Sequence, residues 1–195
     1  MVIGVLALQG GFKAHIEMLN RLEVEAREIR LASDLEGISA LVLPGGESST
    51  MLKLLEREGL FEHIVNLGSK GLPMLGTCAG AILMCNEVVN PQQKSFGFIP
   101  ASIERNAYGS QRESFETEFP IDSWELQAVR ALFIRAPRLL TTDKNVQIIS
   151  TLNEHITGVS YKNFTAVTYH PELTDDLRFH QTWLNRHVRA QEVSS

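Results

Sequence analysis

The chain has 195 residues, of which 44% are hydrophobic and 21% charged, and its formal net charge is -5. This length and composition suit one globular domain with a sizeable core, spanning residues 1–195. The negative charge, together with the lack of any run of Lys and Arg in the sequence, argues against nucleic acid or an anionic membrane as a partner. We therefore expect a small molecule or another protein.

The N-terminus and the cysteines bear on the compartment. The segment "MVIGVLALQGG" has no basic region or small-residue cleavage site, and its apolar run is too short to cross a bilayer. Cys78 and Cys85 would lie about two turns apart on a shared helix, out of disulfide range. A reduced, cytoplasmic compartment fits both observations.

The first half of the chain alternates between strand and helix patterns. The apolar run Val2–Leu8 ends at Gln9-Gly10-Gly11, which is typical of a buried strand and its loop. The pattern then predicts a helix at 12–22, a more exposed strand at 25–31, a buried strand at 40–43, a helix capped by Ser48 or Ser49, a helix at 61–67, a strand at 72–75 and a helix through about Cys85. Such alternation predicts a mostly parallel central sheet with helices on both faces.

The second half is different. Between residues 96 and 169 the apolar residues form short runs separated by turn residues, which predicts mainly strands. Thr174, followed by two aspartates, is a good start for a last helix that extends to about Arg189. We therefore predict a single α/β domain with a mostly parallel sheet and a β-rich second half.

The stretch "LGTCAG" places Cys78 between two glycines, where a buried strand turns into a helix. This is the pattern of a nucleophile elbow, in which the helix N-terminus stabilises a thiolate and the amide of Ala79 is placed to donate to an oxyanion. The alternative is that Cys78 is a small buried apolar residue, and the local pattern leaves both open. Cys85 is interpreted as a structural residue.

A cysteine nucleophile needs a base and a group that orients the base. In "TAVTYHPEL", His170 ends a β-rich run and Glu172 follows at a spacing that lets its carboxylate fold back onto the imidazole. A plain strand end is the alternative. The other histidines are interpreted as surface or core-edge side chains: His15, His63, His155, His180 and His187.

Two further loops follow predicted strands. The glycines Gly45 and Gly46 of "LPGGES" allow a backbone amide to turn toward a ligand. Arg105 and Asn106 supply a cation and an amide suited to a carboxylate or amino-acid ligand. On their own, both segments are also compatible with ordinary solvated turns.

Taken in order, "PGGES", "LGTCAG" and "YHPE" resemble the class I glutamine amidotransferase family. More specifically, "GVLALQGGFKAH", "LPGGESST", "RNAYGSQRESFE", "FIRAP" and "TYHPELTDDLRFHQTWL" resemble the glutaminase subunits of the two-part pyridoxal 5'-phosphate synthases. The resemblance implies an enzyme that hydrolyses L-glutamine to L-glutamate and ammonia. It also implies that the ammonia passes to a synthase subunit in a hetero-oligomeric complex that makes pyridoxal 5'-phosphate.

The resemblance also implies roles for particular residues. Cys78 corresponds to the nucleophile, His170 to the base and then acid, Glu172 to its orienting group, and the amides of Gly46 and Ala79 to the oxyanion donors. The positions that correspond to the substrate pocket are Gly45, Gly46, Glu47, Ser48, Arg105, Asn106, Ile134, Arg135 and Ala136. Gln9 corresponds to the region that meets the synthase subunit, and neither a metal nor a cofactor is expected. In such families the glycine peptide reorients on complex formation, which implies weak activity for the subunit alone.

The chain departs from the family pattern at Tyr108 and Ser110, where the pattern has Phe and Arg. A lost cation would alter ion pairs with Glu113, Glu116 or the partner. Two other functions remain open. A glutaminase for a different amidotransferase is disfavoured by "RNAYGSQRESFE" and "FIRAP". A non-catalytic binding protein with a cysteine elbow is disfavoured by the H-P-E after the last strand.

Overall fold

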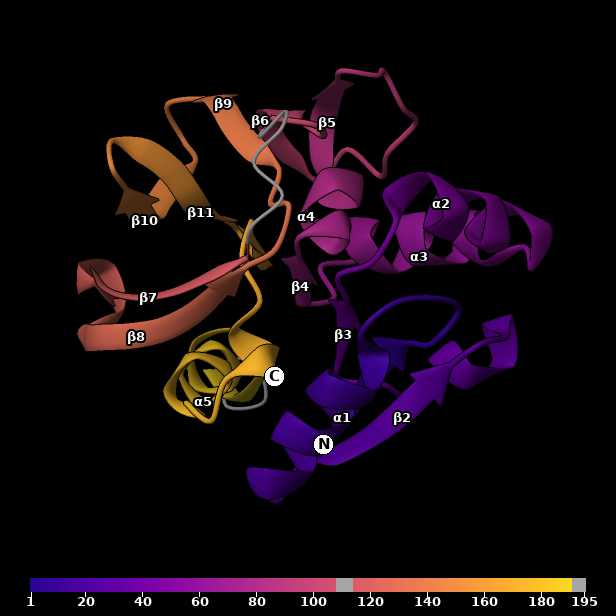
Figure 1. The fold of residues 1–195 in the computed structure, drawn as a ribbon. Coiled ribbons are helices and arrows are strands. Elements are labelled where there is room, and N and C mark those ends of the chain that lie inside the picture. Colours follow the sequence, from indigo (N-terminus) through magenta and orange to yellow (C-terminus); the bar gives the residue numbers. More distant parts are fainter. Residues whose placement is uncertain (108–113, 191–195) are drawn as a thin grey trace.

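The computed structural model describes residues 1–107 and 114–190, which form strands and helices around one large sheet (Figure 1). Its strand order is β2-β1-β3-β4-β12-β11-β9-β6-β5, and β10 pairs with β11. The strands are β1 (Val2–Leu6), β2 (Glu25–Ile29), β3 (Ala40–Leu43), β4 (Met74–Thr77), β5 (Cys85–Val89), β6 (Ile99–Glu104), β7 (Phe115–Ile121), β8 (Leu126–Phe133), β9 (Arg138–Thr142), β10 (Gln147–Leu152), β11 (His155–Tyr161) and β12 (Phe164–Val167). The predicted mixed α/β fold is confirmed.

Parallel pairing runs without interruption from β2 to β12. Leu43 of β3 is level with Gly76 of β4, and Thr77 of β4 is level with Val167 of β12. Because parallel strands end at the same edge of a sheet, the loops after β1, β3, β4 and β12 meet there. Each of these loops carries residues that the sequence had singled out.

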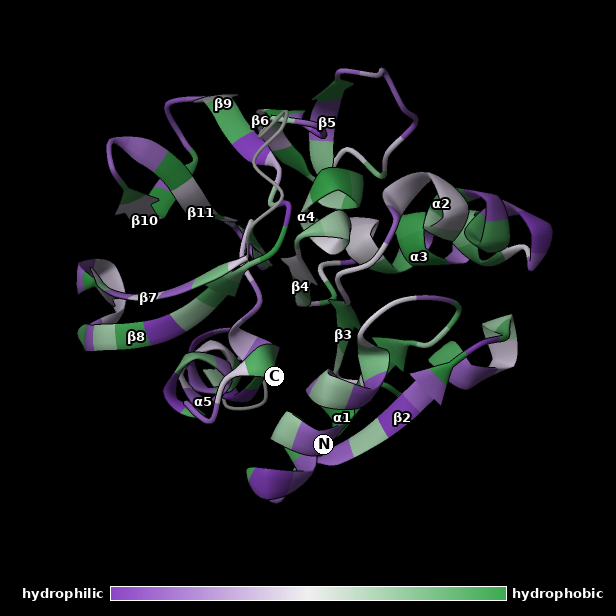
Figure 2. Cartoon of the chain, viewed as in Figure 1, coloured by the Kyte–Doolittle hydropathy of each residue, from purple (hydrophilic) through white to green (hydrophobic). Residues whose placement is uncertain are grey.

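Helices cover both faces of this parallel half, as predicted (Figure 1). They are α1 (Phe12–Arg21), α2 (Ser48–Arg57), α3 (Leu60–Ser69), α4 (Ala79–Met84) and α5 (Arg178–Trp183), the last continued by a π-helical stretch at Leu184–Arg189. The strand residues Val5 and Val42 pack with α1 and α5, whereas Leu41 and Leu43 pack with α2, α3 and α4. Alternate side chains therefore build two cores, which explains why these strands are apolar along their whole length (Figure 2).

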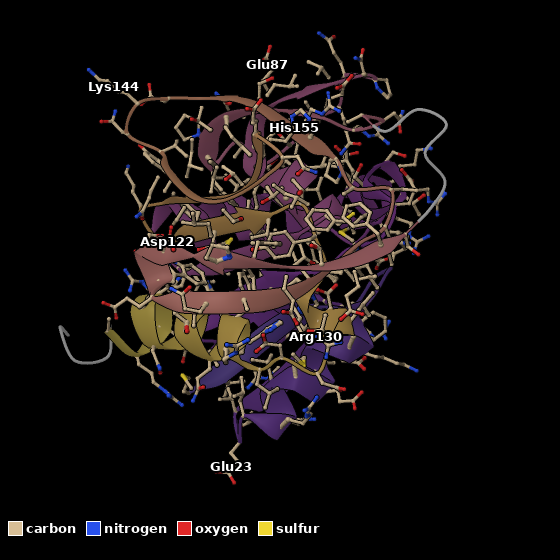
Figure 3. The ribbon with its side chains drawn as sticks, turned by 60° about the vertical axis from the view of Figure 1, so that its left-hand side comes forward. Glu23, Glu87, Asp122, Arg130, Lys144 and His155 are labelled. Atoms are coloured by element: carbon tan, nitrogen blue, oxygen red, sulfur yellow. The ribbon has the colours of Figure 1, made fainter. Side chains whose placement is uncertain are left out.

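The β-rich second half is also confirmed. Here β9, β10 and β11 pair antiparallel, and β7 and β8 form a separate two-stranded sheet. Phe119 and Phe133 from this hairpin contact Tyr169, which is fully buried. Charged side chains such as Glu23, Glu87 and Lys144 project from the outside of the molecule (Figure 3).

Two predicted details of the first half are wrong. The residue that caps α2 is Glu47, whose carboxylate accepts hydrogen bonds from the backbone N–H groups of Ser49 and Thr50, so neither serine is the cap. The helix after Cys78 ends at Met84, and Cys85 is the first residue of β5. A glutamate reaches the same helix amides as a serine, because its longer side chain folds back across the first turn.

The start of the last helix is also later than predicted. A 3₁₀ turn occupies Pro171–Leu173, and α5 begins only at Arg178. Thr174 instead accepts a hydrogen bond from the backbone N–H of Asp176. Tyr108 and Ser110, the two departures from the family pattern, lie outside the described residues, as does Glu113. Within residues 1–107 and 114–190, no helix is long and apolar enough to cross a membrane.

Candidate active site

Cys78 occupies a sharp turn between β4 and α4. Its backbone has φ 48° and ψ -103°, a conformation that non-glycine residues rarely adopt, and its N–H donates to the carbonyl of Val167 at 2.8 Å. The flanking glycines are required by packing, since a Cβ on Gly80 would overlap the Leu43 carbonyl and one on Gly76 would lie 2.7 Å from the carbonyl oxygen of Gly80. The strained residue is thus the cysteine itself, which presents its thiol at the sheet edge.

His170 lies just beyond β12 and is held from several sides. Its backbone N–H donates to the carbonyl of Leu132 at 2.8 Å, which ties it to β8. Its Nδ1 lies 2.7 Å from Oε1 of Glu172, and Cys78 lies close enough to the ring to raise its pKa. Gly45 lies against the imidazole so closely that a Cβ there would overlap the ring. The three side chains therefore form a connected Cys-His-Glu row.

Burial and neighbouring charges set the protonation of this row. Burial opposes a charged imidazole, but the hydrogen bonds and charges of Cys78 and Glu172 outweigh it and raise the pKa of His170 to about 10. Burial also opposes ionisation of Glu172, whereas His15 and His170 hold its pKa at about 2. Burial raises the pKa of Cys85 to about 12, so that thiol stays protonated near neutral pH. The arrangement favours an imidazolium held between an ionised Glu172 and Cys78.

A cavity of about 480 Å³ opens above Cys78. Its lining comes from the loops after β1, β3, β4 and β12, from helices α2 and α4, from the turn after β6 and from the segment after β8. The lining residues are Gln9, Gly11, Gly45, Gly46, Glu47, Ser48, Cys78, Ile82, Arg105, Asn106, Ile134, Arg135, Pro137, His170, Glu172 and Leu173. A volume of this size suits a small molecule.

One wall of the cavity carries an ion pair. Nη2 of Arg105 lies 3.0 Å from Oε1 of Glu47, and the Arg105 side chain is only 13% exposed. Burial opposes ionisation of Glu47, but hydrogen bonds from Thr50 and Ser49 lower its pKa to about 2. Opposite charges fixed side by side are suited to the ammonium and carboxylate groups of an amino acid.

The loop of Gln9 to Gly11 is hydrogen-bonded to the loop of Gly45 to Glu47. The N–H of Gly11 donates to the carbonyl of Gly45 at 2.9 Å, and the N–H of Glu47 donates to Oε1 of Gln9 at 3.0 Å. A Cβ on Gly46 would overlap that same Gln9 oxygen. Gln9 therefore contacts the peptide that was predicted to serve an oxyanion.

The structure brings together almost every residue that the sequence singled out. Ala79 and Ala136 do not line the cavity; Ala136 is buried between Arg135 and Pro137, and Ala79 is the first residue of α4. The amide of a first helical residue has no partner within its own helix, which leaves it free to face a ligand. Sequence reasoning missed the lining residues Gly11, Ile82, Pro137 and Leu173.

The interpretation of His15 and His180 as surface or core-edge residues is wrong, because both are fully buried behind Glu172. His15 lies on α1 in line with the buried Met18 and Leu19, and His180 lies on α5 in line with the buried Trp183. Spacings of three and four residues place side chains on one helix face. That signal was present in the sequence and would have predicted both burials.

Comparison with known proteins gives close matches over nearly the whole chain. The model of the SNO glutamine amidotransferase family matches residues 5–189. A pyridoxal 5'-phosphate synthase subunit PdxT from Thermotoga maritima is 44% identical over 184 residues, covering 94% of this chain and 98% of its own. The subunit PdxT from Pelotomaculum thermopropionicum is 44% identical over 190 residues, or 97% of each chain.

Solved structures agree with the sequence matches. A crystal structure of a glutamine amidotransferase superposes with a TM-score of 0.89 at 40% identity, covering 95% of this chain and 98% of that chain. A more distant glutamine amidotransferase from Thermotoga maritima, at 16% identity and a TM-score of 0.61, shares the fold. With a family model matched over most of its length and relatives well above 30% identity, this chain belongs to the SNO glutamine amidotransferase family.

Proposed function

We propose that this protein hydrolyses L-glutamine to L-glutamate and ammonia and supplies the ammonia to a synthase subunit that makes pyridoxal 5'-phosphate. The observation that carries the proposal is the Cys78, His170 and Glu172 row at the base of the cavity. It occurs in a chain 44% identical to subunits of pyridoxal 5'-phosphate synthase. The relatives and the chemistry of the three side chains therefore support the same proposed activity.

In the proposed mechanism the Cys78 thiolate attacks the carboxamide carbon of glutamine. The resulting oxyanion accepts hydrogen bonds from the amides of Gly46 and Ala79. The imidazolium of His170 gives its proton to the leaving nitrogen, the C–N bond breaks, and ammonia departs from a γ-glutamyl thioester. Neutral His170 then takes a proton from water, which attacks the thioester and releases glutamate and the thiolate. Glu172 keeps the imidazole oriented and stabilises its charge.

The cavity wall provides recognition for the amino-acid end of glutamine. Arg105 is placed to bind the α-carboxylate, and Glu47 to bind the α-ammonium group. Ser48, Asn106, Ile134 and Arg135 complete the proposed pocket, with Gly45 against the imidazole of His170. Ala136 is buried outside the lining and is left out of it. A substrate lacking either charged group would lose one of these two contacts.

The proposed partner is the synthase subunit, docked over the loop of Gln9. Free ammonia becomes ammonium in water, so a docked complex is needed to deliver it. Both cysteines are free thiols, which fits the proposed cytoplasmic location.

The test is ammonia release from glutamine, measured with and without the synthase subunit of the same organism. We expect Cys78→Ala to abolish turnover and Cys85→Ala, a matched thiol in the same region, to retain it. A 6-diazo-5-oxo-norleucine adduct should appear on Cys78 in the mass spectrum. Turnover by Cys78→Ala would refute the nucleophile, and a rate indifferent to the synthase would refute the partnership.

A further inference from the structure

A row of buried polar side chains lies behind Glu172, and the proposed mechanism does not use it. His15 comes from α1, His180 from α5 and Thr77 from the end of β4, and all three are fully buried. Nδ1 of His15 lies 3.1 Å from Nε2 of His180, and Nε2 of His15 lies 3.2 Å from Oγ1 of Thr77. None of the three lines the cavity, so substrate contact does not explain them.

The row of His180, His15 and Thr77 ends at the carboxylate of Glu172. Oε1 of Glu172 lies 2.7 Å from Nδ1 of His170, 3.4 Å from Oγ1 of Thr77 and 3.5 Å from Nε2 of His15. An ionised carboxylate has no hydrogen to donate, so each group that approaches it is most stable as a donor. Thr77 also immediately precedes Cys78, so the row joins the nucleophile's strand to the carboxylate.

Both imidazoles are neutral near neutral pH. Burial lowers the pKa of His15, although the charge of Glu172 opposes this shift, and the charge of His170 adds to it. Burial, and repulsion from His15 when that ring is protonated, lower the pKa of His180 to about 3, against the opposing charge of Glu172. Each ring therefore carries one N–H, and its position decides the direction of the row.

One direction of hydrogen-bond donation along His180, His15 and Thr77 satisfies more of the buried polar atoms than the other. If each ring carries its hydrogen on Nε2, His180 donates to His15, His15 donates to Thr77, and the Thr77 hydroxyl donates to Glu172. The reverse direction would place an N–H on Nδ1 of His180, an atom with no hydrogen-bond partner among the described residues. A buried N–H without a partner is rarer than an unused acceptor, which selects the first direction.

We propose that His180, His15 and Thr77 form a neutral donor relay that positions the carboxylate of Glu172, with His15 and Thr77 as positioning residues for the triad. The catalytic meaning of the relay rests on the proposed function. The titratable groups that face it are Glu172 and His170, with Cys78 beyond them. The relay stabilises the ionised carboxylate without adding a second positive charge beside the imidazolium of His170.

The relay predicts a measurable change at Cys78. Without its donors, the carboxylate of Glu172 would no longer be fixed beside Nδ1 of His170. The imidazolium of His170 would then be stabilised less and would lose its proton at a lower pH. The reaction of Cys78 with iodoacetamide reports this step, because the rate changes where the imidazolium deprotonates. Cys85 does not interfere, since its pKa is about 12 and its side chain is fully buried.

The experiment measures alkylation of Cys78 against pH in the intact chain. Thr77→Val and His15→Leu remove the donors, whereas Thr77→Ser and His15→Gln retain them, and His63→Gln changes an exposed histidine elsewhere. We expect the upper inflection to fall by about one pH unit in the first pair, as the loss of one charge-assisted hydrogen bond implies. We expect the other three variants to match the parent chain.

Two results would overturn the relay. One is an unchanged inflection in Thr77→Val and His15→Leu; the other is an equal shift in the donor-retaining variants. Nitrogen-15 NMR of the unmodified chain is independent of how any variant folds, and it should show the hydrogen on Nε2 of both His15 and His180. A hydrogen on Nδ1 of His180 would refute the direction. Neither readout needs glutamine, so failure of the relay is distinct from failure of the proposed glutaminase activity.

Discussion

Gly45 shows how a single missing side chain positions the imidazole of His170, the proposed general acid and base. The imidazole of His170 occupies the space where a Cβ of residue 45 would stand. We predict that Gly45→Ala displaces the ring from Cys78 and lowers glutamine turnover by about a hundredfold or more, as loss of a general acid–base does. Steady-state ammonia release is the measurement, with circular dichroism to verify folding.

Gly11→Ala is the matched control for this change. Its Cβ would stand 3.9 Å from the nearest atom, Oε1 of Glu172, and its φ of -81° suits alanine. We expect that variant to keep most of its turnover. Equal losses in both variants would mean that contact with His170 is not the cause.

The raised pKa of His170 predicts a dependence of stability on pH. The pKa is 6.5 in the unfolded chain and about 10 in the folded one, so the stabilisation is complete below about pH 6.5 and is lost as pH rises through about 10. We expect the free energy of unfolding of the parent chain to exceed that of His170→Asn most at about pH 6, with the difference shrinking above neutrality. Urea titrations at several pH values measure it. A difference that grew with pH would have the wrong sign and refute the shift.

The members of the proposed triad could be found from the sequence because each lies in a local motif. The buried side chains behind Glu172 could not. "LGTCAG" and "YHPE" each predict a geometry within a few residues. His15 and His180 meet across 165 positions of chain, and only the packing of α1 and α5 against the same face of the sheet brings them together. Helix periodicity could have predicted that both side chains are buried, but it could not have predicted that they contact each other.

At the scale of elements, Glu47 links the start of α2 to the cavity that we propose binds glutamine. It caps the helix through the amides of Ser49 and Thr50 and also pairs with Arg105. We predict that Glu47→Ala lowers the free energy of unfolding by about 1 kcal/mol, the usual contribution of a helix cap. We also predict a rise in KM for glutamine of about tenfold, from the loss of one charged contact. Urea denaturation and steady-state kinetics test the two effects.

Asp34 provides a control for the capping effect alone. Its carboxylate accepts hydrogen bonds from the backbone N–H groups of Arg30 and Leu31, and none of the three residues lines the cavity. Asp34→Ala should therefore lower stability without changing KM. If both variants changed KM alike, the effect of Glu47 would not be specific to the pocket.

Element boundaries were predicted less well than element types, for a physical reason. An apolar run through Ile82 to Cys85 fits a helix or a buried strand, and the change at Cys85 follows from its pairing with β6 beside Ile99. Likewise α5 begins at Arg178, whose guanidinium binds the carboxylate of Asp176 and the carbonyls of Gln127 and Ala128 on β8. Tertiary partners fix both boundaries, and local propensity does not encode them.

At the scale of the whole molecule, the parallel half followed from its pattern, since fully apolar strands alternating with helices admit few other arrangements. The order of the antiparallel half did not follow. In the structure β9 lies between β6 and β11, although neither is its neighbour in the chain, and β7 and β8 leave the main sheet altogether. Short strands with similar alternation are compatible with many pairings, and long-range packing selects among them.

The joined loops at the sheet edge predict how a docked partner would alter the site. Gln9 belongs to the proposed interface, and its Oε1 accepts a hydrogen bond from Glu47, the residue after the proposed oxyanion donor Gly46. We therefore expect Gln9→Leu to reduce the ratio of turnover with the synthase subunit to turnover without it by about tenfold, since oxyanion donors contribute at least that much.

Gln93→Leu is the control for that coupling. Gln93 accepts a hydrogen bond from Ser48, the first residue of α2, but does not line the cavity. Because its contact leads away from the Gln9 loop, we expect the activation ratio to stay near that of the parent chain. Ammonia release at saturating synthase measures both ratios, and complex formation is followed in parallel by analytical ultracentrifugation. If Gln9→Leu still bound the synthase and were fully activated, the hydrogen bond from Glu47 to Gln9 would not be the route by which docking reaches Gly46.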